Sequence, residues 1–271
     1  MKICLDPGHG GYDSGAVGNG LQEKDITLEV CLDLKPMLEY NGITVVMTRA
    51  GDYAPGHLEG DLNGELQARV NIAEQNNVDL FVSVHINTGG GTGEEVLISG
   101  SGGSAETAAN KVLPYLVQVG GWTNRGVKTQ NVFVLRETSM PAILTESGFI
   151  DSAADSAKLK DPKSRQALAV AHAKGICDYF GIPHREGGND VLEVAVLLFS
   201  KEDFWSGTDV AVKNGNCAIF VRSADHSVPK DTMSAKQLIV IGGPTTSHPN
   251  EVLLSGKTKY DTATAVGKYL G

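Results

Sequence analysis

Four residues of this sequence carry side chains that could together bind a metal ion and move a proton. His9 and His85 offer imidazole nitrogens, and Glu23 and Glu146 offer carboxylates. Two imidazoles and one carboxylate are a catalytic zinc set, which leaves a position for a water whose pKa falls towards ~7. A second carboxylate that does not bind the metal can take the proton and return it to a leaving amine. These residue types indicate zinc-dependent hydrolysis if the fold gathers them.

Predicted secondary structure places the four residues at one edge of a sheet. Glu23 ends a glycine-rich loop just before a helix, and the other three follow strands: His9 after Lys2–Asp6, His85 after Leu80–Val84, and Glu146 after Ala142–Thr145. Binding sites of parallel sheets gather outside the carboxyl ends of the strands. Because Glu146 follows four mostly apolar residues, we expect partial burial to raise its pKa and suit it to act as both acid and base.

The residues alone leave other interpretations open. The four lie far apart along the chain, so no compact motif such as HExxH supports the set. A histidine after a strand is often only a hydrogen-bonded polar residue, and Glu146 could be a turn carboxylate. The glycines around His9 do not match the GxGxxG pattern of dinucleotide-binding loops.

The fold class predicted from the pattern is α/β, with a twisted, mainly parallel sheet covered by helices on both faces, plus a small C-terminal α/β domain. We expect a catalytic domain at residues 1–183, a linker without apolar residues at 184–190, and a second domain at 191–271. The predicted strands are 2–6, 43–48, 80–86, 132–135, 142–146, 191–199, 217–221 and 238–241. The predicted helices are 25–40 with Asp25 as its cap, 66–76, 105–119, 164–180, 202–213 and 260–270.

Composition excludes several classes of function. The net charge of -9 and the lack of a basic stripe argue against nucleic acid. No segment approaches the ~18 consecutive apolar residues of a membrane span, so we expect no membrane insertion. The N-terminus lacks the pattern of a signal peptide, which predicts synthesis in the cytoplasm. The four cysteines form no CxxC pair, and we expect buried, reduced thiols at positions 4, 31, 177 and 217.

Several runs of residues stand out by their order and spacing: ICLDPGHGG at 3–11 with Asp13 and Gly15, Glu23-Lys24-Asp25, Thr48-Arg49, LQARVNIA at 66–73, DLFVSVHIN at 79–87 and PAILTESGFI at 141–150. Through these runs, residues 2–180 resemble the family 3 N-acetylmuramoyl-L-alanine amidases of bacterial autolysins and phage endolysins.

This resemblance implies that His9, Glu23 and His85 bind Zn²⁺ and that Glu146 is the catalytic carboxylate. It also implies that peptidoglycan is cut between the lactyl group of N-acetylmuramic acid and the L-alanine of the stem peptide. Ile86 stands where the family commonly has a small residue, and we expect it to trim the cleft beside the metal without removing activity. Two alternatives are another zinc amide hydrolase of the wall, a stem-peptide carboxypeptidase or a deacetylase, and a wall-binding protein with an inactive catalytic domain.

Two runs stand out in the C-terminal part, LIVIGGP at 238–244 and LSGKTKYDTA at 254–263. They resemble a degenerate cell-wall-binding repeat of clostridial surface proteins and endolysins, which usually has Arg where Lys259 stands. The resemblance implies a targeting module for a Gram-positive wall and its secondary polysaccharide. Four aromatic residues could stack on sugars: Phe204, Trp205, Phe220 and Tyr260. We expect most of them to pack in the core instead.

The linker suggests a second translation product. Glu186, Gly187 and Gly188 can be encoded by a ribosome-binding sequence, and Val191 by the start codon GTG. A separately made 191–271 fragment could assemble with the full chain and raise its avidity for the wall, and a homo-oligomer is the other expected assembly. We expect a phage or prophage lysin that reaches the wall after release, or a sporulation or mother-cell lysis enzyme. The histidines outside the matched runs, at 57, 172, 184, 226 and 248, are expected to be structural or on the surface.

Overall fold

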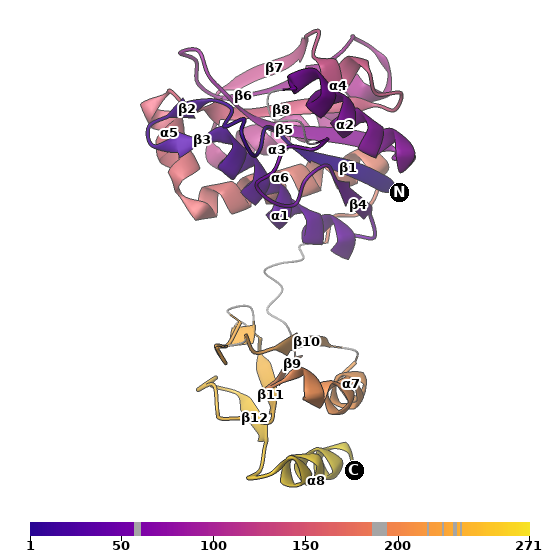
Figure 1. Cartoon of the computed structure of the whole chain (residues 1–271), viewed down its shortest axis with the longest axis vertical. Coiled ribbons are helices and arrows are strands. Elements are labelled where there is room, and N and C mark those ends of the chain that lie inside the picture. Colours follow the sequence, from indigo (N-terminus) through magenta and orange to yellow (C-terminus); the bar gives the residue numbers. More distant parts are fainter. Residues whose placement is uncertain (57–60, 186–193, 216, 224, 230–231, 234) are drawn as a thin grey trace. The chain divides into compact units, whose positions relative to one another are not determined.

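The chain forms two compact units, Met1–Gly187 and Gly188–Gly271, in the computed structural model (Figure 1). The structure describes residues 1–56, 61–185, 194–215, 217–223, 225–229, 232–233 and 235–271. Most of the linker predicted at 184–190, the start of the strand predicted from Val191, and His57 lie outside the described residues.

A six-stranded sheet runs through the first unit in the order β4-β1-β5-β8-β6-β7. Four neighbouring strands are parallel: β4 (Thr44–Met47), β1 (Lys2–Pro7), β5 (Leu80–Asn87) and β8 (Ala142–Phe149). At the other edge, β6 (Glu94–Ile98) pairs antiparallel with β8, and β7 (Asn124–Thr129) pairs parallel with β6. The prediction of a mainly parallel sheet is confirmed, and the reversed edge is an addition to it.

Helices cover both faces of this sheet (Figure 1). Because side chains alternate along a strand, Ile3 and Leu5 enter one core and Cys4 enters the other. The first core packs against α1 (Glu23–Tyr40), α3 (Gly103–Gly120) and α6 (Pro162–Phe180). The second packs against α2 (Leu62–Gln75) and α4 (Phe133–Arg136). The short α5 (Ala153–Lys160) and the hairpin of β2 (Val17–Gly18) and β3 (Leu21–Gln22) complete the unit.

Two sequence predictions about these elements are wrong. Residues 132–135 do not form a strand. The helical turn α4 occupies most of this segment and places the side chains of Val134 and Leu135 in the second core. A short apolar run fits a strand or a buried helical turn equally well. The helix predicted from Asp25 begins at Glu23, with Gln22 as a cap that makes no side-chain hydrogen bond, so Asp25 lies in its first turn. Pro36 does not end this helix, whose apolar face is buried on both sides of the proline.

The second unit is built on a four-stranded parallel sheet in the order β10-β9-β11-β12. The strands are β9 (Val194–Leu198), β10 (Ala218–Val221), β11 (Gln237–Ile241) and β12 (Glu251–Leu254). One face packs against α7 (Phe204–Lys213), which follows a short 3-10 turn at Lys201–Asp203, and α8 (Lys259–Leu270). Of the described strands and α-helices of this unit, β12 has no counterpart among the elements predicted from the sequence.

Three of the histidines outside the matched runs take structural positions, and the cysteines are free. His172 and His248 are buried, and His226 stacks on Phe199 with ring centroids 4.7 Å apart. The four cysteines are free thiols; the expected burial is found for Cys4, Cys31 and Cys177, whereas Cys217 is only half-buried.

Burial of His172 makes the stability of the first unit depend on pH. Its Nδ1 donates to the carbonyl oxygen of Leu168 at 2.7 Å, and its Nε2 lies 2.9 Å from the hydroxyl of Thr145. This arrangement suits a neutral ring, and burial lowers the pKa of His172 from 6.5 to about 4. The unfolded chain therefore binds the proton more readily between these values.

We expect protonation of His172 in the unfolded chain to lower the free energy of unfolding by about 3 kcal/mol as the pH drops from about 6.5 to 4. Urea unfolding of the wild-type chain and of His172→Gln, at several pH values, measures the effect. The variant should lose this part of the decline, because glutamine does not titrate. An equally steep decline in both chains would show that His172 makes no such contribution.

Candidate metal centre and active site

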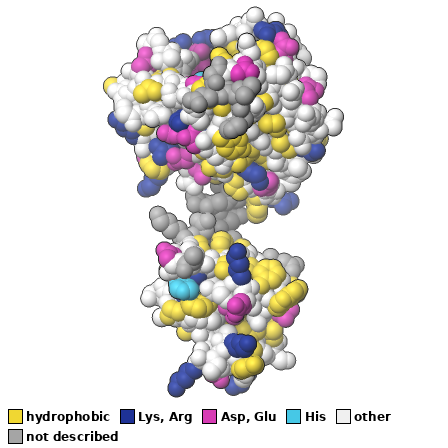
Figure 2. All heavy atoms as spheres, viewed as in Figure 1, with side chains coloured by type: hydrophobic (Ala, Val, Ile, Leu, Met, Phe, Trp, Pro, Cys, Tyr) yellow, Lys and Arg dark blue, Asp and Glu magenta, His cyan; other side chains and the backbone are white. Residues whose placement is uncertain are grey.

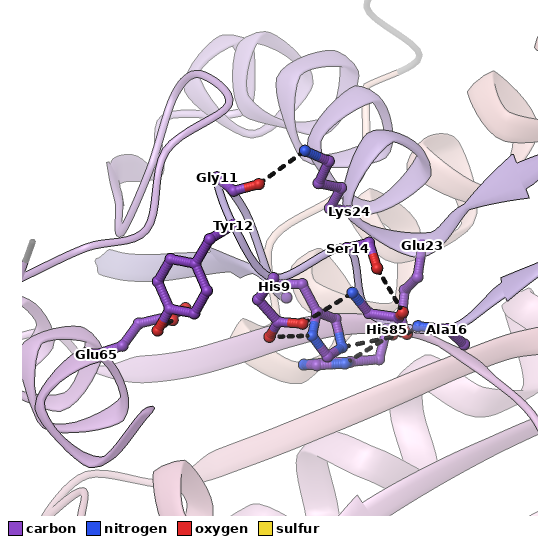
Figure 3. A network of polar contacts seen from close by, with 12 residues as sticks. His9, Gly11, Tyr12, Ser14, Ala16, Glu23, Lys24, Glu65 and His85 are labelled. Carbon is purple, nitrogen blue, oxygen red and sulfur yellow. Dashed lines mark hydrogen bonds and ion pairs between the residues drawn. The ribbon is translucent and has the colours of Figure 1, made fainter. Parts of the chain in front are cut away.

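Three of the four predicted site residues meet at the carboxyl edge of the parallel strands (Figure 3). His9 follows β1, Glu23 opens α1, and His85 lies near the end of β5. The Nε2 atom of His9 lies 3.1 Å from one carboxylate oxygen of Glu23, and the Nδ1 atom of His85 lies 2.9 Å from the other. One nitrogen or oxygen from each residue fits within 4.8 Å of the others, so the group could hold a metal ion.

Local hydrogen bonds orient the ring of His9. Its Nδ1 donates to Oδ2 of Asp13 at 2.7 Å, which turns Nε2 towards Glu23. The other oxygen of Asp13 accepts from the backbone N–H of Gly15. A carboxylate on the far nitrogen fixes the tautomer and direction of a metal-binding imidazole. Asp13 belongs to a matched run of the sequence, but its type and position alone did not indicate this role.

The carboxylate of Glu23 is held from both sides. The backbone N–H of Ala16 donates to Oε2 at 2.9 Å, and that of Ile86 donates to Oε1 at 3.0 Å. Burial alone would raise the pKa of Glu23, but the hydrogen bonds and charges of His85 and His9 hold it well below its usual range. The group is therefore an anion in place before any cation arrives.

The same charges act on the neighbouring imidazole. Burial opposes the charged form of His9, but the hydrogen bonds and charges of Glu23 and Asp13 outweigh it and raise the pKa of His9 to about 9. An acidic pocket thus holds a protonated ring where a cation could sit. A metal ion that binds here displaces that proton, since only the neutral nitrogen is a ligand.

Close packing of glycines shapes this pocket. A Cβ atom at Gly8 would lie 2.3–2.7 Å from atoms of the His85 ring. Gly15 has φ +62°, and a Cβ there would lie 2.6 Å from the His9 ring and 2.7 Å from Oε2 of Glu23. The glycine-rich loop therefore brings backbone against the three side chains where any larger residue would push them apart.

Glu146 stands directly beside His85. The two residues are register partners in the parallel pair of β5 and β8, so their side chains leave the same face of the sheet. One carboxyl oxygen of Glu146 is buried without a hydrogen-bond partner among the described residues. Burial raises the pKa of Glu146 to about 7, although the charge of His85 opposes the shift. Strand β8 runs on to Phe149, so Glu146 lies within the strand rather than at its end.

Two buried arginines support the backbone on which His9 stands. Arg69 donates to the carbonyl oxygen of His9 at 2.6 Å and forms ion pairs with Asp6 at 2.7 Å and Glu65 at 2.6 Å. Arg49 donates to the carbonyl oxygen of Gly8 at 2.9 Å. In Figure 3, the hydroxyl of Tyr12 donates a hydrogen bond to Glu65, and the ammonium group of Lys24 donates one to the carbonyl oxygen of Gly11. These contacts fix the rest of the loop. Both arginines lie in matched runs of the sequence, but no local pattern predicts which groups they contact.

Ile86 does not trim the cleft, so this expectation is wrong. Its side chain is buried in the core that packs against α1, α3 and α6. Successive strand residues point to opposite faces, so Ile86 points away from the face that carries His85 and Glu146. The residue affects the site through its backbone N–H, which binds Glu23.

An α/β sheet whose carboxyl edge gathers two imidazoles and a carboxylate beside a second acid defines a hydrolase with a centre that could hold a metal. The sequence profile of the family Amidase_3, N-acetylmuramoyl-L-alanine amidase, matches residues 3–178. The chain belongs to this family.

Individual relatives agree with the family match. The sporulation-specific N-acetylmuramoyl-L-alanine amidase of Bacillus subtilis (strain 168) is 41% identical over 185 residues, which cover 67% of this chain and 69% of that protein. The endolysin of Bacillus phage SPP1 is 37% identical over 195 residues, which cover 69% of each chain. The catalytic domain of the amidase CwlV from Bacillus (Paenibacillus) polymyxa var. colistinus has a TM-score of 0.61 and 34% identity, over 68% of this chain and 99% of that one.

The protein is therefore a peptidoglycan hydrolase that cleaves the amide bond between N-acetylmuramic acid and L-alanine, and it acts on the cell wall. The comparisons favour this activity over the carboxypeptidase and deacetylase alternatives. Among the described helices, none has the length and hydropathy to cross a membrane.

Proposed function

We propose that this amidase is a zinc enzyme and that His9, Glu23 and His85 bind the ion. The observation that carries the proposal is the convergence of one ligand atom from each residue within 4.8 Å. Two imidazoles and one carboxylate suit Zn²⁺, whereas Mg²⁺ and Ca²⁺ prefer oxygen ligands. When bound, zinc polarises the scissile carbonyl and lowers the pKa of a water molecule.

The protein side chains have separate tasks in this proposal. Asp13 orients His9, and the N–H groups of Ala16 and Ile86 fix both oxygens of Glu23. Glu146 does not bind the metal but takes the proton of the attacking water and passes it to the nitrogen of L-alanine as the amide breaks. A pKa of about 7 supports both steps, because the group is then close to balance between its two forms at neutral pH.

Digestion of purified peptidoglycan sacculi tests the zinc proposal. We expect new L-alanine amino termini to appear, to stop appearing after treatment with a chelator, and to return when Zn²⁺ is added. Released D-alanine or acetate would instead indicate a carboxypeptidase or a deacetylase. Cleavage that continues at the same rate in the chelated protein, with zinc shown to be absent by mass spectrometry, would contradict the proposal.

The packing around Gly15 predicts a specific loss of zinc affinity. Gly15→Ala places a methyl group against His9 and Glu23, so we expect zinc affinity to fall by about 10–100-fold, as with other disturbed ligand supports. Gly20→Ala is the matched control: φ is +77° there, so the backbone strain is similar, but nothing lies within 4 Å of the added atom. Competition with a zinc-binding dye measures both variants. Similar affinities in the two would mean that the contact with the ligands does not matter.

For the second unit we propose a targeting role, in which it binds the wall and its secondary polysaccharide. Hydrophobic side chains lie exposed on this unit (Figure 2), among them Trp205 at 80%, Tyr260 at 73% and Phe204 at 47%. Core packing was expected for most of the aromatic residues named from the sequence. It is found for Phe220, but the expectation is wrong for Phe204, Trp205 and Tyr260, which are exposed. Exposed aromatic rings support sugar binding because they can stack on sugar faces. Co-sedimentation of the chelated full chain with walls, with and without their polysaccharide, tests the role.

We propose in addition that the second unit assembles, either in a homo-oligomer or with a separately translated fragment of residues 191–271. Val191 lies outside the described residues, so the support comes from the exposed apolar side chains of α7 and α8 and from the small size of the unit. Light scattering of the purified protein, combined with mass spectrometry for a fragment that starts at position 191, tests both forms. A monomer without such a fragment would contradict both.

A further inference from the structure

A row of side chains continues from the site towards the reversed edge of the sheet. His85 pairs with Glu146 across β5 and β8, and Glu146 pairs with Glu95 across β8 and β6. Directly paired residues point to the same face, so the three side chains form one line across three strands. Neighbouring strands lie about 4.8 Å apart, which places Glu95 roughly 10 Å from His85.

The line ends in two cations on β7. Arg125 contacts Oε2 of Glu95 through Nε at 2.6 Å, and Nζ of Lys128 contacts the same oxygen at 2.5 Å. The amide of Asn87 donates to the other oxygen at 3.0 Å. The Glu95 side chain is 8% exposed, whereas those of Arg125 and Lys128 are 31% and 42% exposed. Two cations share one carboxylate, so this end of the row presents positive charge to solvent.

Arg125 keeps its two terminal nitrogens available. Only Nε is used on Glu95, and among the described residues neither terminal nitrogen has a hydrogen-bond partner. The guanidinium lies over the ring of Phe149, 4.7 Å from its centroid, which fixes the plane of the group. A planar, pre-oriented guanidinium beside an ammonium group is well suited to bind a carboxylate with two hydrogen bonds.

We propose that Arg125 and Lys128 form a subsite for the free carboxylate of the second residue of the stem peptide. The inference rests on the proposed function, because it takes the scissile bond to lie at His9, Glu23 and His85. The lactyl carboxyl of the sugar forms the amide bond and therefore carries no charge. An anionic group of the substrate near the scissile bond must then belong to the peptide. An extended peptide advances about 3.3–3.6 Å per residue, which carries the second residue roughly 7 Å away, within reach of the two long cationic side chains.

Matched muropeptides test the subsite. One carries D-glutamate and the other D-isoglutamine at the second position, so they differ by one carboxylate charge. We expect the full-length enzyme to cleave the acid with a kcat/KM about tenfold above that of the amide, mainly through a lower KM. In Arg125→Gln/Lys128→Gln the ratio should fall to about one, and Arg125→Lys should keep more of the preference than Arg125→Gln.

Lys111 on α3 also pairs with a single carboxylate, that of Asp178 on α6. Lys111→Gln is therefore the matched control. Its ratio should stay near ten. Equal cleavage of the two muropeptides by the unaltered enzyme, or a ratio that stays near ten in the double variant, would overturn the subsite and leave the zinc proposal standing. Failure of the zinc proposal appears separately, in the chelation of the unaltered enzyme.

Discussion

Replacing Glu146 with glutamine is expected to lower kcat by about 10²–10⁴-fold while the zinc content of the protein stays the same. The amide is similar in size and can still occupy the space beside His85 on β8. It cannot accept a proton from water or deliver one to the leaving nitrogen, so the step that breaks the amide bond loses its acid and base. Because Glu146 is not proposed as a metal ligand, zinc binding should not depend on its charge.

Single-turnover cleavage of a muropeptide, together with zinc analysis of the same sample, measures both quantities. Glu137→Gln is the control, since that carboxylate is exposed and, within the described part of the chain, pairs only with its neighbour Arg136. Two results would oppose the assignment. One is a variant with normal kcat, and the other is a variant that loses its zinc, which would make Glu146 a ligand.

Replacing Glu23 with glutamine is expected to lower zinc affinity by more than about 100-fold and to remove activity at ordinary zinc concentrations. Glutamine keeps the length of the side chain but removes the negative charge that faces His9 and His85. The amide also brings an NH₂ group into a site where two backbone N–H groups already donate, at Ala16 and Ile86, so one donor would meet another. Both changes weaken binding of a cation.

Glu39→Gln provides a control on the same helix. Glu39 is exposed near the end of α1 and pairs with Lys35, so its loss should leave zinc affinity and activity unaltered. Zinc affinity is measured by competition with a chelating dye, and folding by urea unfolding in the absence of metal. Full activity of Glu23→Gln at limiting zinc would contradict the assignment.

The sequence predicted the parallel part of the fold because that part is encoded locally. Strands β1, β5 and β8 each contain an apolar run, at 3–5, 80–82 and 142–144, and His85 and Glu146 follow two of these runs. The reversed strands were missed because β6 opens with Glu94 and Glu95, and β7 contains five polar residues or glycines in six positions, NRGVKT. Their place in the sheet depends on pairing with β8 and with each other, which no local pattern contains.

The contacts that support the site could not be predicted from the sequence, for a similar reason. Arg69 reaches Asp6 and His9 from the middle of α2, where its charge would suggest a solvent-facing position. The direction of Ile86 follows only once the register of β5 is known. By contrast, the four proposed site residues could be named, because three of them follow predicted strands and the fourth ends a glycine-rich loop just before a helix.

X-ray absorption spectroscopy of the zinc-loaded protein, combined with anomalous diffraction at the zinc edge, addresses the metal centre directly. We predict one ion per chain in the first unit, bound by a ring nitrogen of His9, a ring nitrogen of His85 and a carboxylate oxygen of Glu23, with Glu146 nearby but not bound to the metal. An ion held by any other set of residues, or density for zinc elsewhere with this trio empty, would contradict the account.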